Sequence, residues 1–506
     1  MPLNIHERIM RPLLLLGCMM VFLVIPLKII SYGYLPGDDA LRHTAFAVDN
    51  RNWNEVLLLN PEFHANLDSH PGWHAFLRFF HQHLGFTQED LVILSVTMAF
   101  VVFTWAGLAV SGNPLAWQFA CAIVAATEHS LFQRFLLGRP MFFSMTALAV
   151  MLFVWTRSKP VRPWVEALVA VFLLTLSIYM HPTVWYLWSM PGLALVLCKR
   201  WRSAFILGGA LVVSICLAAL LLGSWYNVLV LPMLVIKYSI LQDPLLGTSL
   251  VGELQPSGGP TTGLLIVAGV LMIKWWRGGS LRDELSKVDF VLVVMTWLLG
   301  MHMMRFWFEW GLPALTVWLC RQIKQILDLK LNGFARVSDS LWLAAFSAGV
   351  LFMGTTADIG GRYTQNLKSP LLTKPVDDFR AQLPDEGGIL YTLDMTVFYK
   401  LYYRMPDLKF RFSTGFEPGF MRPEDLKVFR AVQFNENLLD SYGPWIQKMT
   451  PKDRLIIYYP VRPVWPEMEF TQFYSAWIGK KVVQKEKTEP SPLPAPAPQL
   501  GAPAKS

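Results

Sequence analysis

The feature that most constrains this chain is a series of long apolar runs separated by short polar connections. More than half of its 506 residues are hydrophobic (54%) and only 16% are charged, whereas an ordinary soluble protein carries about 25% charged residues. A helix that crosses the core of a bilayer requires about 20 apolar residues. The pattern therefore predicts an α-helical polytopic membrane protein with about eleven transmembrane helices, near residues 12–32, 91–111, 114–131, 141–156, 164–180, 183–198, 204–225, 262–276, 288–304, 310–322 and 340–355.

Lysine and arginine are concentrated in every second connection between these runs, which orients the predicted helices. Basic tracts precede the first run and recur near residues 157–162, 199–202, 274–287 and 324–336. Short basic connections stay on the cytoplasmic side of a membrane. We therefore expect a cytoplasmic N-terminus, with the loop 33–90 and everything after residue 355 on the outer face. These tracts account for the net charge of +8, so the charge indicates no nucleic-acid partner.

The composition divides the chain into three parts. Residues 1–361 form the predicted transmembrane domain, which includes the first outer loop 33–90. Residues 362–480 are polar and contain strand-like runs such as "GGILYTL" and "RLIIYYP", which predicts a small extracytoplasmic α/β domain. Residues 481–506 are rich in proline and alanine, and we expect a disordered tail. No small-residue cleavage site follows the first run, so we expect an uncleaved first helix. A short compact chain with a Pro/Ala-rich tail is typical of bacteria, so we expect the protein in a bacterial inner membrane.

Two common kinds of site have no signal in this sequence. The five cysteines all lie in or beside apolar runs, so neither a disulfide nor a thiolate metal site is expected. A glycine-rich nucleotide-binding motif is also missing, which argues against a nucleotide-sugar or ATP site on the cytoplasmic side. We therefore expect no cofactor, and a divalent cation such as Mg²⁺ or Mn²⁺ stays open as an alternative.

Ionisable residues gather at helix ends on the predicted outer face, where the cost of placing charge near the membrane makes them candidates for function. Asp38 and Asp39, in "GYLPGDDALRH", come directly after the first apolar run. They could cap a short helix, with Asp39 paired to Arg42 or His43 one turn later. They could equally supply a metal site, or a catalytic base for a substrate carried by lipid.

Other residues on this face each allow more than one interpretation. His70 and His74 are four residues apart and could share a helix face, which fits a metal site, a phosphate contact or interfacial packing. No third ligand at a fixed spacing supports the metal. Arg139 and Arg305 stand beside aromatic residues at membrane edges, where arginine serves as an anchor or as a bidentate phosphate ligand. Glu309 is expected to pair with an arginine under either interpretation.

Four short motifs follow one another along the chain in a recognisable order. The acidic pair precedes "ALRHTAFAVDNRNW", and "SHPGWHAFLRFFHQHLG" comes next. "GRP" opens the fourth predicted helix, and "RFWFEWGLP" precedes a late helix and the soluble outer domain. In this order they resemble the motifs of GT-C superfamily membrane glycosyltransferases, which use polyprenyl-phosphate-linked sugar donors. The second motif is similar to the Lys/His-Pro-Pro-Leu…Gly segment of the protein mannosyltransferase and aminoarabinose-transferase branch.

The chain departs from the superfamily pattern in two places. Pro71-Gly72 stands where the family segment has Pro-Pro, and His70 stands in place of its usual lysine. The Trp-Trp-Asp motif of the oligosaccharyltransferase branch is missing from the outer domain, which argues against that branch.

The resemblance implies an inverting transfer in which a carboxylate takes the proton of an acceptor hydroxyl while a lipid phosphate leaves the sugar. Asp39 is the expected general base, with Asp38 second. The other expected site residues are Arg139, Arg305, His70 and His74 for the donor phosphate, His43 and Glu309 in support, and Glu128 with His129 as a second acidic site like that of metal-using members. The expected partners are a polyprenyl-phosphate sugar donor, membrane lipids, and a glycan, lipid or protein acceptor.

Three other functions are compatible with parts of the sequence. A polysaccharide polymerase or ligase also acts on polyprenyl-linked sugars, but generally depends on a large late outer loop, whereas here the largest loop is the first. A transporter of lipid-linked glycans tends to show internal repeats and broken helices at mid-membrane, which this sequence does not show. A non-catalytic subunit that positions partners through residues 362–480 differs from an enzyme only in keeping its function when an acidic residue is changed.

Overall fold

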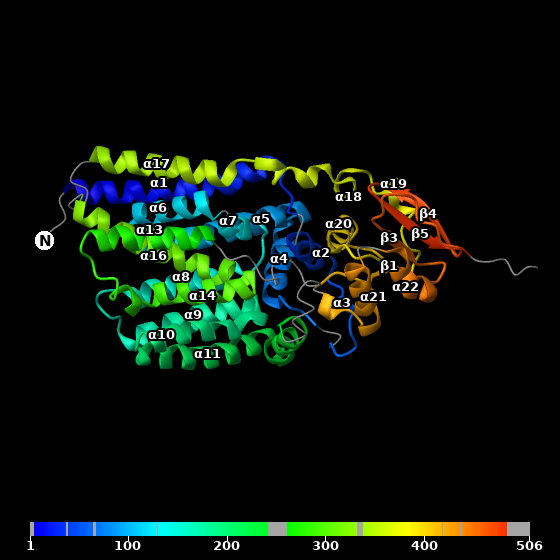
Figure 1. Cartoon of the computed structure of the whole chain (residues 1–506), viewed down its shortest axis with the longest axis horizontal. Helices are drawn as coiled ribbons and strands as arrows, with labels where there is room; N and C mark the ends of the chain where they lie inside the picture. Colours follow the sequence, from blue (N-terminus) through cyan, green and yellow to red (C-terminus); the bar gives the residue numbers. More distant parts are fainter. Residues whose placement is uncertain are drawn as a thin grey trace, which may run out of the picture.

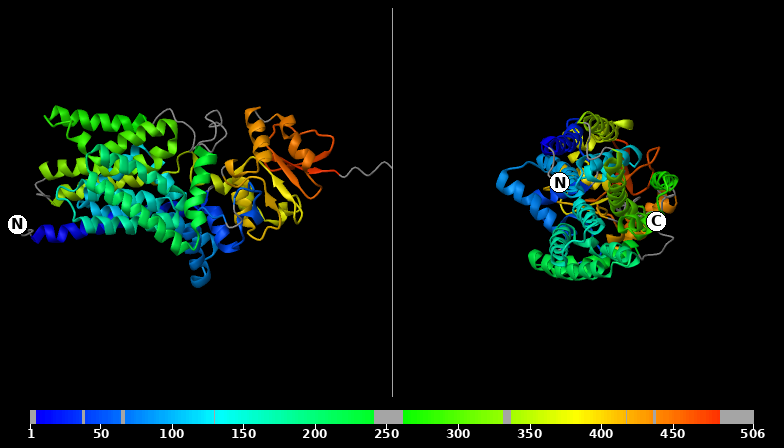
Figure 2. Two further views of the ribbon diagram at one scale, coloured as in Figure 1. Left: turned by 90° about the horizontal axis from the view of Figure 1, so that it is seen from below. Right: turned by 90° about the vertical axis from the view of Figure 1, so that its left-hand side faces the viewer.

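The computed structural model describes residues 5–36, 39–63, 67–128, 130–240, 261–330, 337–416, 418–435 and 438–482. A bundle of apolar helices occupies one end of the long axis, and a small sheet with its covering helices occupies the other (Figure 1). The start of α1 and the sheet lie at opposite ends of the molecule (Figure 2). The predicted tail 481–506 lies almost wholly outside the described residues.

Apolar helices make up the bundle, as the hydrophobic runs predict. Four helices within the described ranges are long and apolar enough to cross a bilayer: α1 (Ile5–Ile30), whose apolar part begins at Pro12, α5 (Gln88–Ser111), α9 (Pro163–Met180) and α11 (Trp201–Leu222). Beside them lie α6 (Pro114–Thr127), α7 (Ser130–Leu136), α8 (Phe142–Thr156), α10 (Ser189–Leu197), α12 (Leu231–Val235), α13 (Thr261–Trp276), α14 (Val288–His302), α16 (Leu312–Lys330) and α17 (Val337–Thr356). The expectation of a mostly helical membrane protein with a small sheet is confirmed, and the count of eleven spans stays a prediction.

Local sequence signals explain where several of these helices begin, end and meet. α5 starts at a capping box, in which Thr87 accepts the backbone N–H of Asp90 and the Asp90 carboxylate accepts the backbone N–H of Thr87. It ends at Gly112, whose φ of 70° is the left-handed conformation that favours glycine. Gly107 lies directly against the ring of Trp117 on α6, so a side chain there would push the two helices apart.

Some helices differ from the predicted runs because tertiary contacts override them. The predicted run 114–131 is divided at Glu128 into α6 and α7, and the Glu128 carboxylate accepts the backbone N–H of Gly263 at the start of α13 (2.8 Å). The predicted helix 183–198 begins as a 3₁₀ helix, η1 (Pro182–Trp188), before α10. Before α16 the chain passes through α15 (Met304–Phe306) and the π-helical turn η7 (Trp307–Gly311), and short π-helical turns, η2 (Tyr226–Val230) and η3 (Ile236–Ile240), flank α12.

A five-stranded sheet forms the core of the C-terminal part. Its strands stand in the order β2-β1-β3-β5-β4, with β1 parallel to β2 and β3, and with β5 antiparallel to β3 and β4. The strands are β1 (Ile389–Tyr391), β2 (Arg411–Phe412), β3 (Arg454–Ile457), β4 (Met468–Phe473) and β5 (Ala476–Lys481). The α-helices described in this part of the chain are α18 (Pro370–Thr373), α19 (Asp377–Arg380), α20 (Met395–Arg404), α21 (Pro423–Phe434) and α22 (Gly443–Lys448).

The first loop joins the bundle to this C-terminal part. It contains α2 (Asp39–Asp49), α3 (Trp53–Val56) and α4 (Pro71–Leu84), which lie between the bundle and the sheet in Figure 1. α2 packs against both α4 and α20. Tyr402 of α20 donates a hydrogen bond to Asp49 (2.9 Å), and Leu58 pairs through its backbone N–H with Phe412 of β2 (2.9 Å). These contacts hold the end of α2 and the segment after it against the C-terminal part.

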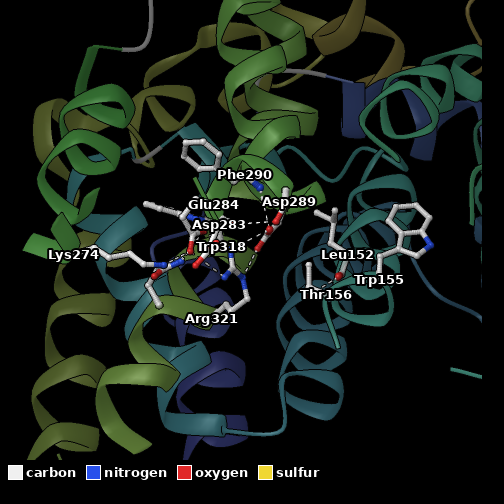
Figure 3. A network of polar contacts seen from close by, with 12 residues as sticks. Leu152, Trp155, Thr156, Lys274, Asp283, Glu284, Asp289, Phe290, Trp318 and Arg321 are labelled. Carbon is white, nitrogen blue, oxygen red and sulfur yellow. Dashed lines mark hydrogen bonds and ion pairs between the residues drawn. The ribbon is translucent and has the colours of Figure 1, made fainter. Parts of the chain in front are cut away.

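A second set of polar contacts stabilises the bundle near α13, α14 and α16 (Figure 3). Arg321 of α16 binds two buried carboxylates: Nη2 to Glu284 (2.7 Å) and Nε to Asp289 (2.9 Å). Trp318 also donates to Glu284 (3.0 Å), and Lys274 forms an ion pair with it. Burial alone would raise the pKa of Glu284, but hydrogen bonds and charge from Arg321 outweigh it and lower that pKa to about 2. The two positive side chains, Lys274 and Arg321, thus compensate the charge of the two carboxylates, Glu284 and Asp289.

Candidate active site

A cavity of about 370 Å³ lies where the bundle, the first loop and the C-terminal part meet. Its walls carry three arginines and two carboxylates among the residues that the structure describes: Arg42, Arg139, Arg305, Asp39 and Asp394. Aromatic and apolar side chains fill much of the remaining wall. An enclosed space that is largely apolar and has a few convergent charged groups is the usual form of a small-molecule site.

Asp39 is the first residue of α2, and each of its carboxylate oxygens binds an arginine. Oδ1 lies 2.9 Å from Nη2 of Arg42, and Oδ2 lies 3.1 Å from Nε of Arg139. Arg139 reaches Asp39 because Gly138 turns the chain with a φ of 64° and brings its backbone against Ala40 and Ser95. A Cβ on Gly138 would lie 3.0 Å from the Cβ atoms of both residues, so the position leaves no space for a side chain. The predicted pairing of Asp39 with Arg42 is present in the structure.

Aromatic rings surround the guanidinium of Arg42. Its Cζ lies 4.7 Å from the centre of the Phe416 ring and 5.8 Å from each of the Tyr399 and Trp53 rings. Arg42 is 4% exposed, and cations gain from contact with aromatic faces when water is excluded. Phe416 and Tyr399 belong to the C-terminal part, so that part helps to hold Arg42 at the cavity.

Arg305 lies on another wall of the cavity and is held by Glu309. Its Nε is 2.9 Å from both carboxylate oxygens of Glu309, one helical turn further on. Arg134 of α7 also donates to Glu309 (3.0 Å), which is 1% exposed. Two guanidinium groups thus compensate one buried carboxylate, and the expected pairing of Glu309 with an arginine is present.

A hydrogen-bonded chain of histidines lies beside the cavity. Nδ1 of His74 is 2.8 Å from Asp68, and Nε2 of His74 is 2.7 Å from Nδ1 of His43. A carboxylate only accepts hydrogen bonds, so His74 carries its proton on Nδ1 and His43 donates from Nδ1. Nε2 of His43 has no hydrogen-bond partner within the described part of the chain. His43 and His74 are both 1% exposed and do not line the cavity.

Two further histidines do line the cavity. The rings of His70 and His181 are stacked, with centroids 4.5 Å apart and an angle of 9° between the planes. Nδ1 of His70 is 2.7 Å from the hydroxyl of Ser69, and Nε2 of His181 is 3.1 Å from that of Thr183. Burial lowers the pKa of His43 and His70 well below the usual value, and nearby positive groups lower it further. His181, just after the end of α9, has a pKa lowered to about 3, mainly by burial. These histidines are therefore neutral near pH 7.

The neutral histidines predict how stability depends on pH. When pH falls below about 6.5, the unfolded chain binds protons on these side chains while the folded chain does not. Stability should therefore be unaffected above that pH and should decrease below it, by about 1.4 kcal/mol per pH unit for each histidine. Thermal unfolding of the purified protein in detergent between pH 5 and 8 measures this. In the His43→Gln, His181→Asn double variant, the decrease below pH 6.5 should be smaller. An equal decrease in both proteins would contradict the assignment.

The remaining predicted residues lie away from the cavity or outside the described ranges. Glu128 is bonded to Gly263 and is not part of the cavity wall. Asp38 and His129 lie outside the described residues, so the second carboxylate of the acidic pair and half of the proposed second acidic site are not placed. Within the described ranges, no group of three or more His, Cys, Asp or Glu side chains is arranged to hold a metal ion.

Several residues of the cavity wall were not among the site residues predicted from the sequence. Asp394 caps α20 by accepting the backbone N–H of Thr396 (2.8 Å), and it also accepts the hydroxyl of Tyr458 (2.9 Å). Tyr399 and Phe416 reach the cavity from the same C-terminal part. The sequence shows Asp394 only as an aspartate before a helix. No feature of the sequence indicates that Asp394 lies in the same cavity as Asp39.

Comparison with known proteins identifies the fold. No family model matches the sequence, and no curated protein sequence matches it significantly. Among solved structures, the archaeal oligosaccharyltransferase AglB from Archaeoglobus fulgidus, in complex with an inhibitory peptide and a dolichol-phosphate, aligns with a TM-score of 0.53 and 10% identity over 87% of this chain and 69% of its own. ArnT from Cupriavidus metallidurans, in the apo state, aligns with a TM-score of 0.53 and 12% identity over 88% of this chain and 92% of its own. Both are GT-C superfamily membrane glycosyltransferases, so the resemblance inferred from the motifs is confirmed at the level of the fold.

Proposed function

We propose that this chain, which has the GT-C fold, is an inverting membrane glycosyltransferase that moves a sugar from a polyprenyl-phosphate-linked donor to a hydroxyl-bearing acceptor. The observation that carries the proposal is the meeting of Asp39, Arg139 and Arg305 around one cavity at the end of the helix bundle. A carboxylate is the group needed to take a proton, and guanidinium groups suit a phosphate. AglB, which has the same fold, was solved with a dolichol-phosphate bound.

The reaction assigns a separate task to each charged group. Asp39 takes the proton of the acceptor hydroxyl while the hydroxyl oxygen attacks the anomeric carbon of the sugar. The new glycosidic bond forms as the bond from the anomeric carbon to the phosphate oxygen breaks, and its electron pair leaves with the lipid phosphate. Attack from the face opposite the leaving group inverts the anomeric configuration. The phosphate gains a negative charge, so positive charge on the cavity wall stabilises the transition state.

Arg139 and Arg305 are the proposed phosphate ligands, because both line the cavity and carry forked donors. His70 lines the same wall and contributes as a neutral hydrogen-bond partner. His74 lies behind the wall in contact with His43, so in this proposal it positions its neighbours and does not contact the phosphate. Asp38 and Glu128 with His129 stay predictions without a placed role.

The proposal includes an arrangement in the membrane. Eleven spans would place the N-terminus in the cytoplasm and residues 362–480 on the outer face of a bacterial inner membrane. The cavity lies at the end of the bundle that contacts the C-terminal part. The start of α1 lies at the opposite end in Figure 2, which supports the same orientation. A lipid-borne donor would then meet its acceptor outside the cell membrane.

Loss of a proposed phosphate ligand should weaken lipid binding. We expect Arg305→Ala to reduce the affinity of the purified protein for decaprenyl phosphate by about tenfold or more, since a hydrogen bond to a charged group contributes roughly 1.5–3 kcal/mol. Arg305→Lys should restore only part of it, because lysine cannot form the forked contact. Microscale thermophoresis in detergent measures the dissociation constants.

The matched control is Arg277→Ala, which removes an exposed arginine just after α13 and away from the cavity. Its affinity for decaprenyl phosphate should equal that of the unmodified protein. If Arg305→Ala lowers expression yet leaves the affinity unchanged, Arg305 is a membrane anchor and the phosphate role is wrong.

A further inference from the structure

Asp39 is bound by two arginines that themselves line the cavity. Their positive charge determines how readily the Asp39 carboxylate can accept a proton. The contacts are 2.9 Å to Arg42 and 3.1 Å to Arg139, and the three side chains are only 17%, 5% and 14% exposed. Positive neighbours favour the ionised form of a carboxylate and make it a weaker base. The arrangement that holds Asp39 in place therefore also opposes its taking a proton.

Arg42 is equipped to bind a second anion. A guanidinium has five N–H donors, and the contact of Arg42 with Asp39 is made through Nη2. Its Nε–H is buried and has no hydrogen-bond partner within the described ranges. A buried N–H without a partner is costly, and a phosphate oxygen in the cavity would satisfy it after a small shift of the side chain.

Arg305 differs from these two arginines because it is bound to Glu309 instead of Asp39. A phosphate that enters the cavity therefore meets Arg305, which is paired with Glu309, and also Arg42 and Arg139, which are paired with the proposed base Asp39. An anion that binds to Arg42 and Arg139 shares their positive charge with Asp39 and so weakens their hold on the carboxylate. Competition for a shared cation links the two sites thermodynamically.

We propose that Arg42 and Arg139 transfer from Asp39 to the donor phosphate when the donor binds, so that Asp39 becomes a competent base only in the presence of donor. This inference rests on the proposed function, because it takes a lipid phosphate as the ligand. The donor then binds before the acceptor, and Asp39 stays unreactive in the empty cavity. His43 on α2 and His181 at the end of α9 are neutral near pH 7 and add no charge to Asp39, while Asp394 faces the same cavity from α20.

Linkage between donor binding and protonation of Asp39 tests the proposal. When the two arginines leave and a phosphate approaches, the proton affinity of Asp39 rises, so donor binding takes up a proton at acidic pH, near the ordinary pKa of an aspartate. An arginine neighbour lowers the pKa of an aspartate by about 1–3 units. Reversal of a lowering of about two units returns an aspartate to its ordinary pKa of about 3.9, so the affinity should change little between pH 7 and pH 5 and should be about eightfold higher at pH 3 than at pH 7.

The probe is decaprenyl-phosphoryl-glucose, whose phosphodiester keeps one charge throughout this pH range. Isothermal titration calorimetry in buffers of different ionisation enthalpy counts the protons taken up by the full-length protein in detergent. Asp39→Asn should bind the lipid at least as tightly as the unmodified protein and with no such pH dependence. The matched control is Asp394→Asn, which changes a carboxylate of the same cavity that is bonded to Thr396 and Tyr458, and it should keep the dependence.

The possible outcomes separate the two claims. No proton uptake by the unmodified protein, or equal uptake by it and by Asp39→Asn, overturns the transfer of the arginines and leaves the proposed function standing. If the unmodified protein does not bind the lipid at any pH, the proposed function and this inference both fail. A loss of pH dependence in Asp39→Asn but not in Asp394→Asn supports the proposal.

Discussion

Asp39→Asn is expected to abolish sugar transfer while the protein stays folded and in the membrane. A positioned general base contributes about 10²- to 10⁴-fold to a reaction rate, and asparagine cannot take the proton. Asparagine has nearly the same shape and keeps an acceptor oxygen for one arginine. The glycan products of a deletion strain of the native host, analysed by mass spectrometry after complementation with each variant, measure transfer whatever the chemical class of the acceptor.

Two controls make the Asp39→Asn result interpretable. Binding of decaprenyl phosphate by this variant should be retained or stronger, because a carboxylate that competes for Arg42 and Arg139 has been removed. Complementation by Asp394→Asn should exceed that by Asp39→Asn, because Asp394 serves as a helix cap. Undiminished product in the Asp39→Asn strain would eliminate Asp39 as the base.

Arg321→Met is expected to destabilise the protein more than any change at an exposed charge. The substitution leaves Glu284 and Asp289, which are 1% and 0% exposed, without their shared guanidinium. Removing one partner from a buried ion pair costs about 3–5 kcal/mol of unfolding free energy, because the remaining charge stays buried and uncompensated. Denaturant unfolding in mixed micelles, followed by tryptophan fluorescence, measures the change.

The control for this prediction is Lys237→Gln. Lys237 forms an ion pair with Glu62 at 3.0 Å, but both side chains are more than half exposed (55% and 53%). Such pairs are screened by solvent and contribute little, so its unfolding midpoint should match that of the unmodified protein. Equal midpoints for Arg321→Met and Lys237→Gln would show that the cluster around Arg321 is not a source of stability.

The helical part of the fold could be predicted because the bilayer restricts what an apolar run can form. A chain in hydrocarbon must satisfy its backbone hydrogen bonds internally, so long apolar runs become helices. α5, α9 and α11 accordingly lie within a few residues of their predicted ranges. The break at Glu128 and the π-helical turn at Trp307–Gly311 could not be predicted, because Glu128 contacts Gly263 and Trp307 packs against Gly300, and both partners are brought there only by the tertiary structure.

The candidate site was predicted in part for a similar reason. Asp39, Arg139 and Arg305 stood out because charge next to a membrane is costly and therefore conspicuous in a sequence. Asp394 and Phe416 could not be found in this way, since they are ordinary residues of a polar segment with mixed helices and strands. Their place in the cavity arises only when α20 packs against α2, more than 300 residues away in the sequence.

A cryo-EM structure of the protein with decaprenyl-phosphoryl-glucose would show where the donor phosphate and the anomeric carbon bind. We predict that the phosphate lies in the 370 Å³ cavity within hydrogen-bond distance of Arg139 and Arg305, and that the anomeric carbon faces the carboxylate of Asp39. Density for the lipid phosphate at another surface, with the cavity occupied only by water, would contradict the account.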